Sequence, residues 1–230
     1  MSRVEYGETW AYESIVGGLP GIDLPEWAAL ALQIVLFEVG LLLLAWWYDV
    51  WAAVPAGTAA VVVAGVGSLA MLRISDGTRS LPVPRAYTRL LFGSSIEVVL
   101  AVLSFVALIT HLFVFDPQTA ATPLLDRLFE GSVPVPVAYL TLLVLWDLCY
   151  RIGTSWWMAV VDLWSAWRLE FPPEARPQFR RLSAMNVGFG LVQLALVPFL
   201  TEAPTLLVAV AGHVVAVASV SGTAAWLVGR

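Results

Sequence analysis

The sequence predicts an all-α membrane protein, a polytopic bundle of about six transmembrane helices with both termini in the cytoplasm. Three observations support this fold class. Hydrophobic residues make up 60% of the 230 residues and charged residues only 13%, whereas soluble domains carry about 25% charged residues. The mean hydropathy is +0.83. Six apolar runs have close to or more than the roughly 20 residues that a helix needs to cross a bilayer.

Polar or helix-breaking segments separate the predicted spans. Pro25 suits the first turn of a helix, and a very short connection around Asp49 follows the first span. Arginines and prolines precede the third and fifth spans, and the loop before the fourth span contains a small helix near residues 124–129. We expect an acidic cytoplasmic segment (1–24) and then one domain (25–230) with spans at 27–48, 52–72, 90–115, 135–157 extending to 167, 182–200 and 204–228.

The arginines predict the orientation of the bundle. The chain has no lysine, and six spans place ten of its twelve arginines on the side of both termini. The positive-inside rule makes that side cytoplasmic, so we expect a cell-membrane protein with its Arg-rich loops inside. Basic residues beside a membrane can bind anionic lipid head groups. The candidates for this role are Arg85, Arg89, Arg176, Arg180 and Arg181.

The fourth span carries its polar and charged residues on one helical face, with tryptophans on the opposite face. Asp147 and Arg151 lie four residues apart with the acid first, the favourable order for an ion pair. This pair either holds the bundle together or acts as a gate in which Arg151 exchanges between Asp147 and Glu38 of the first span. Gly153 leaves open whether this helix is continuous or bent.

Further ionisable residues in the predicted spans suggest a path across the membrane, because charged groups in the hydrocarbon mark functional positions by default. In the third span a Glu, a Ser and a His recur every seven residues along a seam of about 21 Å. Three intramembrane acids face a single arginine, so one acid is protonated, bonded to polar groups or bound to a cation. The alternative interpretation is that these charged residues form pairs between helices and not a path across the membrane. The candidate proton or cation path is Glu38, Glu97, Asp147, Arg151, His111 and His213.

Two resemblances to known proteins involve the fourth span. Gly153-Thr154-Ser155, with His213 in the sixth span, resembles the rhomboid intramembrane proteases and would imply a serine hydrolase. However, Trp156 stands where the rhomboid motif ends in glycine, and Ser155 and His213 lie toward opposite membrane faces, so this is the most remote alternative. The run WDLCYRIG at 146–153 resembles uncharacterised multi-pass proteins of haloarchaea, which implies no activity.

Composition excludes one class and leaves two functions open. A retinal protein needs a lysine for its Schiff base, and this chain has none. We expect no metal, no cofactor and no nucleic acid among its ligands, because the motifs for them are missing from the sequence. One remaining function is a small proton- or cation-linked transporter or channel. The other is a non-catalytic membrane component, as a homo-oligomer or as a subunit or assembly partner in a larger complex.

Overall fold

The computed structural model describes residues 10, 25–129, 131 and 133–230. All regular structure in this part of the chain is helical, and six helical segments in it are long and apolar enough to cross a membrane. This confirms the all-α fold and the six helices that could span a membrane. The acidic segment expected at residues 1–24 lies, apart from Trp10, outside the described residues.

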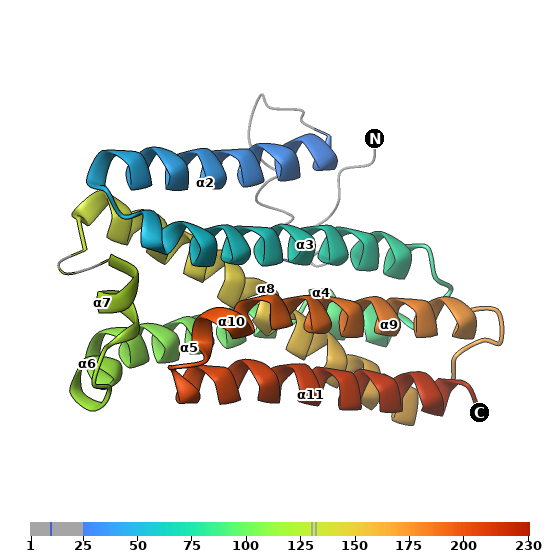
Figure 1. Cartoon of the computed structure of the whole chain (residues 1–230). Helices are drawn as coiled ribbons and strands as arrows, with labels where there is room; N and C mark the ends of the chain where they lie inside the picture. Colours follow the sequence, from blue (N-terminus) through green and yellow to red (C-terminus); the bar gives the residue numbers. More distant parts are fainter. Residues whose placement is uncertain (1–9, 11–24, 130, 132) are drawn as a thin grey trace.

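Consecutive spans alternate in direction along the bundle (Figure 1). Several are built from more than one helical piece, because prolines and short breaks interrupt them. The spans comprise α2 (Glu26–Tyr48); η1 (Trp51–Ala53) with α3 (Val54–Arg79); α4 (Arg85–Phe92), α5 (Ile96–Thr110), the π-helix η2 (His111–Phe115) and α6 (Asp116–Thr119); α8 (Val135–Arg168); α9 (Arg176–Val192), the 3₁₀-helix η3 (Gln193–Leu196) and α10 (Val197–Leu200); and α11 (Pro204–Val228). The short helix α7 (Leu124–Phe129) confirms the small helix expected before the fourth span.

The helices of the third and fifth spans begin before the predicted bounds of those spans. The third span breaks after α4, where Ser95 adopts a left-handed backbone with φ 53°. The fifth begins at Arg176 rather than at residue 182, and α3 likewise continues to Arg79. Hydropathy falls where a helix reaches the polar interface. It therefore underestimates the length of helices that continue beyond the apolar run with arginines on their exposed faces.

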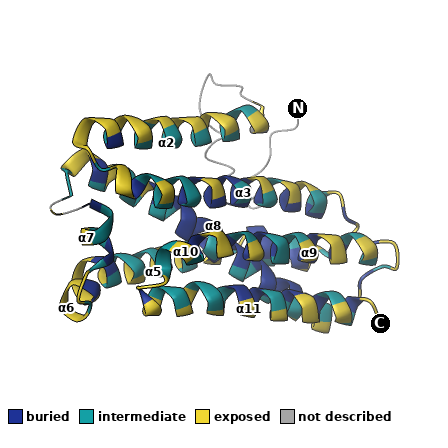
Figure 2. Ribbon diagram, viewed as in Figure 1, coloured by how far each residue is buried: buried dark blue, intermediate teal, exposed yellow. Residues whose placement is uncertain are grey.

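The helix α8 occupies the centre of the bundle and contacts α3, α5 and α11. The middle of α8 is buried, whereas many residues of α2 are exposed, on the side that faces away from the bundle (Figure 2). It runs without a break through Gly153. Gly153 instead allows α5 to approach α8 closely, because a Cβ at residue 153 would lie only 2.8 Å from the backbone nitrogen of Ala101. Small residues allow helix backbones in membranes to approach in this way.

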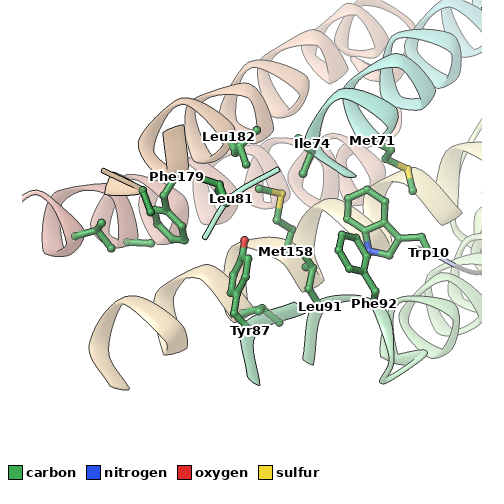
Figure 3. Packing of buried hydrophobic residues seen from close by; sticks show 14 of the residues in the cluster. Trp10, Met71, Ile74, Leu81, Tyr87, Leu91, Phe92, Met158, Phe179 and Leu182 are labelled. Carbon is green, nitrogen blue, oxygen red and sulfur yellow. The ribbon is translucent and has the colours of Figure 1, made fainter. Parts of the chain in front are cut away.

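The two ends of the bundle differ in packing. We call the half with the ends of α3, α8 and α11 and the start of α9 the arginine end, and the half with the α2–α3 connection, α7 and α10 the cavity end. The largest buried apolar cluster lies at the arginine end (Figure 3). There the Tyr87 ring lies 6.0 Å from the rings of both Phe171 and Phe179, which are 4.7 Å from each other. These aromatic contacts attach α4 and the connection at 169–175 to the spans.

Candidate functional site

The predicted ion pair in the fourth span is present and buried. The Nη2 of Arg151 donates a hydrogen bond to Oδ1 of Asp147 at 2.8 Å. The other carboxylate oxygen accepts 2.7 Å from Nε2 of Gln33 on α2, and Nη1 of Arg151 lies 3.4 Å from the sulfur of Met71 on α3. Both oxygens of Asp147 therefore have donors, and the pair connects α8 to two neighbouring helices.

A second buried acid, Asp162, lies about four fifths of the way along α8. Its two carboxylate oxygens accept hydrogen bonds from the Tyr87 hydroxyl at 2.9 Å and the Ser183 hydroxyl at 2.8 Å. Asp162 is 0% exposed, so these two donors replace the water that the carboxyl group loses on burial. The acid joins α8 to α4 and α9.

Polar groups between α8, α9 and α11 complete this network at the arginine end. The Ser155 hydroxyl donates to Oδ1 of Asn186 at 2.8 Å. The amide nitrogen of Asn186 donates to the Ser155 carbonyl at 3.0 Å and to the Ser221 hydroxyl at 3.2 Å. A void of about 10 Å³ beside these residues and Arg151 has room for about one water molecule.

Two further acids of the predicted path, Glu38 and Glu97, lie on α2 and α5. Glu38 on α2 accepts a hydrogen bond from the Thr58 hydroxyl of α3 at 2.7 Å. Glu97 is fully buried in the first turn of α5. The exchange of Arg151 between Asp147 and Glu38 stays a hypothesis.

The arginines expected at lipid head groups gather at the arginine end. Arg85 and Arg89 lie on α4 and are exposed, as are Arg180 and Arg181 on α9. Arg176 is half-buried, and its Nε donates to the Phe171 carbonyl at 3.3 Å. These residues lie on helices rather than on the loops that the sequence predicts.

The cavity end holds a cavity of about 560 Å³. Leucine, valine, alanine and isoleucine form most of its wall. Side chains from all six spans and from α7 contribute to this wall. Three wall residues are exposed: Ala107 on α5, and Thr205 and Ala209 on α11. These exposed wall residues place the opening of the cavity between α5 and α11.

Few polar side chains face the cavity, and three of them are His111, Gln193 and His213. Gln193 is 0% exposed, and neither atom of its side-chain amide has a hydrogen-bond partner among the described residues. The buried Nε2 atoms of His111 and His213 have none there either. None of the acids or arginines in the described part of the chain lines this cavity.

Backbone irregularities coincide with two of these residues. His111 is the first residue of the π-helix η2, and Gln193 is the first residue of the 3₁₀-helix η3. Pro117 and Pro198 follow within a few residues, and proline removes a helical hydrogen bond and displaces the carbonyl four residues before it. Such irregular turns within long helices often occur at functional sites.

The comparison with known proteins identifies a family. Residues 5–224 match DUF7530, a family of unknown function. The chain belongs to this family. Neither the curated proteins nor the solved structures contain a match. Membership in DUF7530 agrees with the expectation of an uncharacterised family and assigns no activity.

The sequence predicted the ion pair of the fourth span but not the cavity. The i, i+4 spacing predicted the Asp147–Arg151 pair. His111 and His213, for which the sequence predicts a place on an ion path, line the apolar cavity. Ser155, the serine of the rhomboid resemblance, bonds to Asn186, whereas His213 lies at the cavity with its ring 6.5 Å from that of Trp156. The seven-residue spacing of Asn186 and Gln193 predicts that both bond across helices and, as a second interpretation, that they contact a substrate. Asn186 does bond across helices, whereas Gln193 has no hydrogen-bond partner among the described residues.

Proposed function

We propose that this DUF7530 protein binds an apolar molecule inside the membrane, in a non-catalytic role. The observation that carries the proposal is the cavity of about 560 Å³ at the cavity end. Ligand pockets commonly measure about 300–1,000 Å³ and have mainly apolar walls with a few polar groups. The opening between α5 and α11 would let a molecule enter sideways from the bilayer.

The placement of the charges supports binding over ion conduction. Asp147, Asp162 and Glu38 each accept hydrogen bonds from neighbouring helices. An ion crossing the cavity would meet a wall without charged side chains among the described residues. Desolvation in such surroundings costs an ion far more than it costs an apolar molecule.

Two adjacent residues on α11 provide a matched test. Ala209 lines the cavity at its opening, whereas Val208 is 70% exposed and lies outside the cavity wall. Binding of a fluorescent apolar polyene should be measured in phosphatidylglycerol nanodiscs, at low and molar salt. We expect Ala209→Trp to weaken binding at least about tenfold and Val208→Trp to leave it unchanged. Equal binding by wild type and both variants would contradict the proposal.

The second candidate function is a proton- or cation-linked transporter or channel. One observation favours it: the buried polar groups from Gln33 through Asp147 and Arg151 reach the void of about 10 Å³ beside Ser155 and Asn186. Water in that void would extend a route for protons. Proton and cation flux into proteoliposomes tests this function with Glu38→Gln, Glu97→Gln and Asp147→Asn. Flux that is unchanged in all three variants would exclude these acids as the route.

We also propose that the arginine end faces the cytoplasm, so that the cavity lies in the outer half of the membrane. The positive-inside rule supports this orientation. In a Cys149→Ala background, a membrane-impermeant maleimide should label Ala121→Cys in intact cells. It should label Glu174→Cys, in the connection before α9, only after lysis. The reverse pattern would invert the orientation.

A further inference from the structure

Gln193 is the most unusual polar group of the structure. Its amide oxygen and nitrogen are buried without a hydrogen-bond partner among the described residues. A buried polar group of this kind normally lowers stability, and native proteins contain few of them. The other buried amide of the same span, Asn186, is bonded on both of its atoms. Gln193 is therefore placed to bond to something that enters the cavity.

The two histidines add to this polar surface from other helices. Nε2 of His111 comes from the third span and Nε2 of His213 from α11, and both atoms are buried at the cavity wall without a described partner. A neutral imidazole nitrogen can donate or accept a hydrogen bond, and an amide can do both. Three adaptable hydrogen-bonding groups thus face one apolar space.

The charge of the wall limits the class of ligand. A phosphate or carboxylate head group would need arginine or lysine, or several backbone N–H groups, to offset its desolvation. The described residues of the wall include no charged side chain. The arginines of the spans lie elsewhere, with Arg151 paired to Asp147. The polar part of the ligand is therefore uncharged.

The remaining wall accommodates a hydrocarbon chain. It consists mainly of aliphatic side chains from the six spans and α7, and its exposed members Ala107 and Ala209 mark the opening between α5 and α11. A chain longer than the cavity could extend through this opening into the bilayer without meeting polar groups.

Building on the proposed function, we propose that the cavity binds a neutral long-chain molecule whose head carries carbonyl or hydroxyl oxygens, and that Gln193, with His111 and His213, holds that head by hydrogen bonds. Quinones with an isoprenoid tail and long-chain alcohols share this chemistry. A quinone offers only acceptors, whereas an alcohol both donates and accepts. A phospholipid is excluded by the uncharged wall.

The test uses Gln193→Leu, which keeps the size of the side chain and removes its polar atoms. Equilibrium binding of a labelled isoprenoid quinone, a labelled long-chain alcohol and an alkane of matched length is measured on the full chain in phosphatidylglycerol nanodiscs. We expect Gln193→Leu to weaken binding of the preferred oxygen-bearing ligand roughly tenfold. Alkane binding and the thermal stability of the ligand-free protein should not fall. His111→Phe and His213→Phe should weaken head-group binding in the same direction.

Each result has a distinct meaning. Tighter binding of the quinone or of the alcohol identifies the source of the head group. If Gln193→Leu binds both ligands as tightly as wild type while Ala209→Trp still blocks binding, the head-group inference fails and the proposed function stands. If all three molecules bind equally to wild type and Ala209→Trp, both fail. Displacement of the labelled ligands by added phospholipid would also overturn the inference.

Discussion

The two ends of the bundle differ in the hydrogen bonding of their buried amide side chains. At the arginine end, Asp162 and Asn186 are bonded to side chains of neighbouring helices, and aromatic rings belong to the buried cluster there. At the cavity end, Gln193 is equally buried but has no described hydrogen-bond partner, and the space beside it is open. The same span, α9 to α10, carries both Asn186 and Gln193.

This contrast indicates that buried polar groups serve the stability of the fold at one end of the bundle and ligand binding at the other. Polar groups with internal partners fix how helices pack, since each group must be satisfied without water inside the membrane. A polar group left without a partner can bond to a ligand at little cost to the protein itself. Substitutions should therefore lower the stability of the fold at the arginine end and weaken ligand binding at the cavity end.

The largest effect on stability is expected for Arg151→Met. The substitution leaves the Asp147 carboxylate buried without its cation, which typically costs about 3–5 kcal/mol. Reversible unfolding in mixed detergent micelles measures this loss. The control is Asp76→Asn, which removes one charge of the exposed pair with Arg79 and should cost at most about 1 kcal/mol. Equal effects of the two substitutions would contradict a structural role for the buried pair.

A smaller loss of unfolding free energy is expected when Asp162 loses one of its two hydrogen-bond donors. Tyr87→Phe or Ser183→Ala leaves one buried carboxylate oxygen without its hydrogen bond, at a cost of about 1–3 kcal/mol each. The same unfolding assay applies. Tyr139→Phe, at a residue that is 66% exposed, serves as the control and should have no effect.

A substitution that crowds the contact between α8 and α5 should lower stability by a comparable or slightly smaller amount than the loss of a donor to Asp162. Gly153→Ala places a methyl group 2.8 Å from the Ala101 backbone nitrogen, so one helix must shift, at about 1–3 kcal/mol. Gly212→Ala on α11 is the matched control, because a Cβ there meets no atom within 4 Å. Its stability should equal or exceed that of the wild type. A tolerated Gly153→Ala would show that the α5–α8 contact is looser than described.

The smallest effect on stability is expected for Gln193→Leu. Replacing an unbonded buried amide by an apolar group of similar size should leave the unfolding free energy unchanged or raise it by about 1 kcal/mol. A loss as large as that of Tyr87→Phe would mean that Gln193 has a structural partner, and the contrast between the two ends would disappear.

The sequence predicted what depends on neighbours within one helix. Apolar length predicted the spans, and the i, i+4 spacing predicted the Asp147–Arg151 pair. Contacts between helices were not predictable in this way: nothing near Gln33 in the chain indicates that it bonds to Asp147. The break at Ser95 depends on a left-handed residue that was not predicted from its sequence context. The cavity is enclosed by side chains from all six spans and α7, so no pattern within one helix indicated it.

The most direct test of the central claim is native mass spectrometry of the protein extracted from its own membrane. The account predicts that wild type and Val208→Trp retain an uncharged long-chain molecule that survives removal of phospholipid, and that Ala209→Trp lacks it. An adduct that is present in all three proteins, or only phospholipid adducts in each, would contradict binding in the cavity.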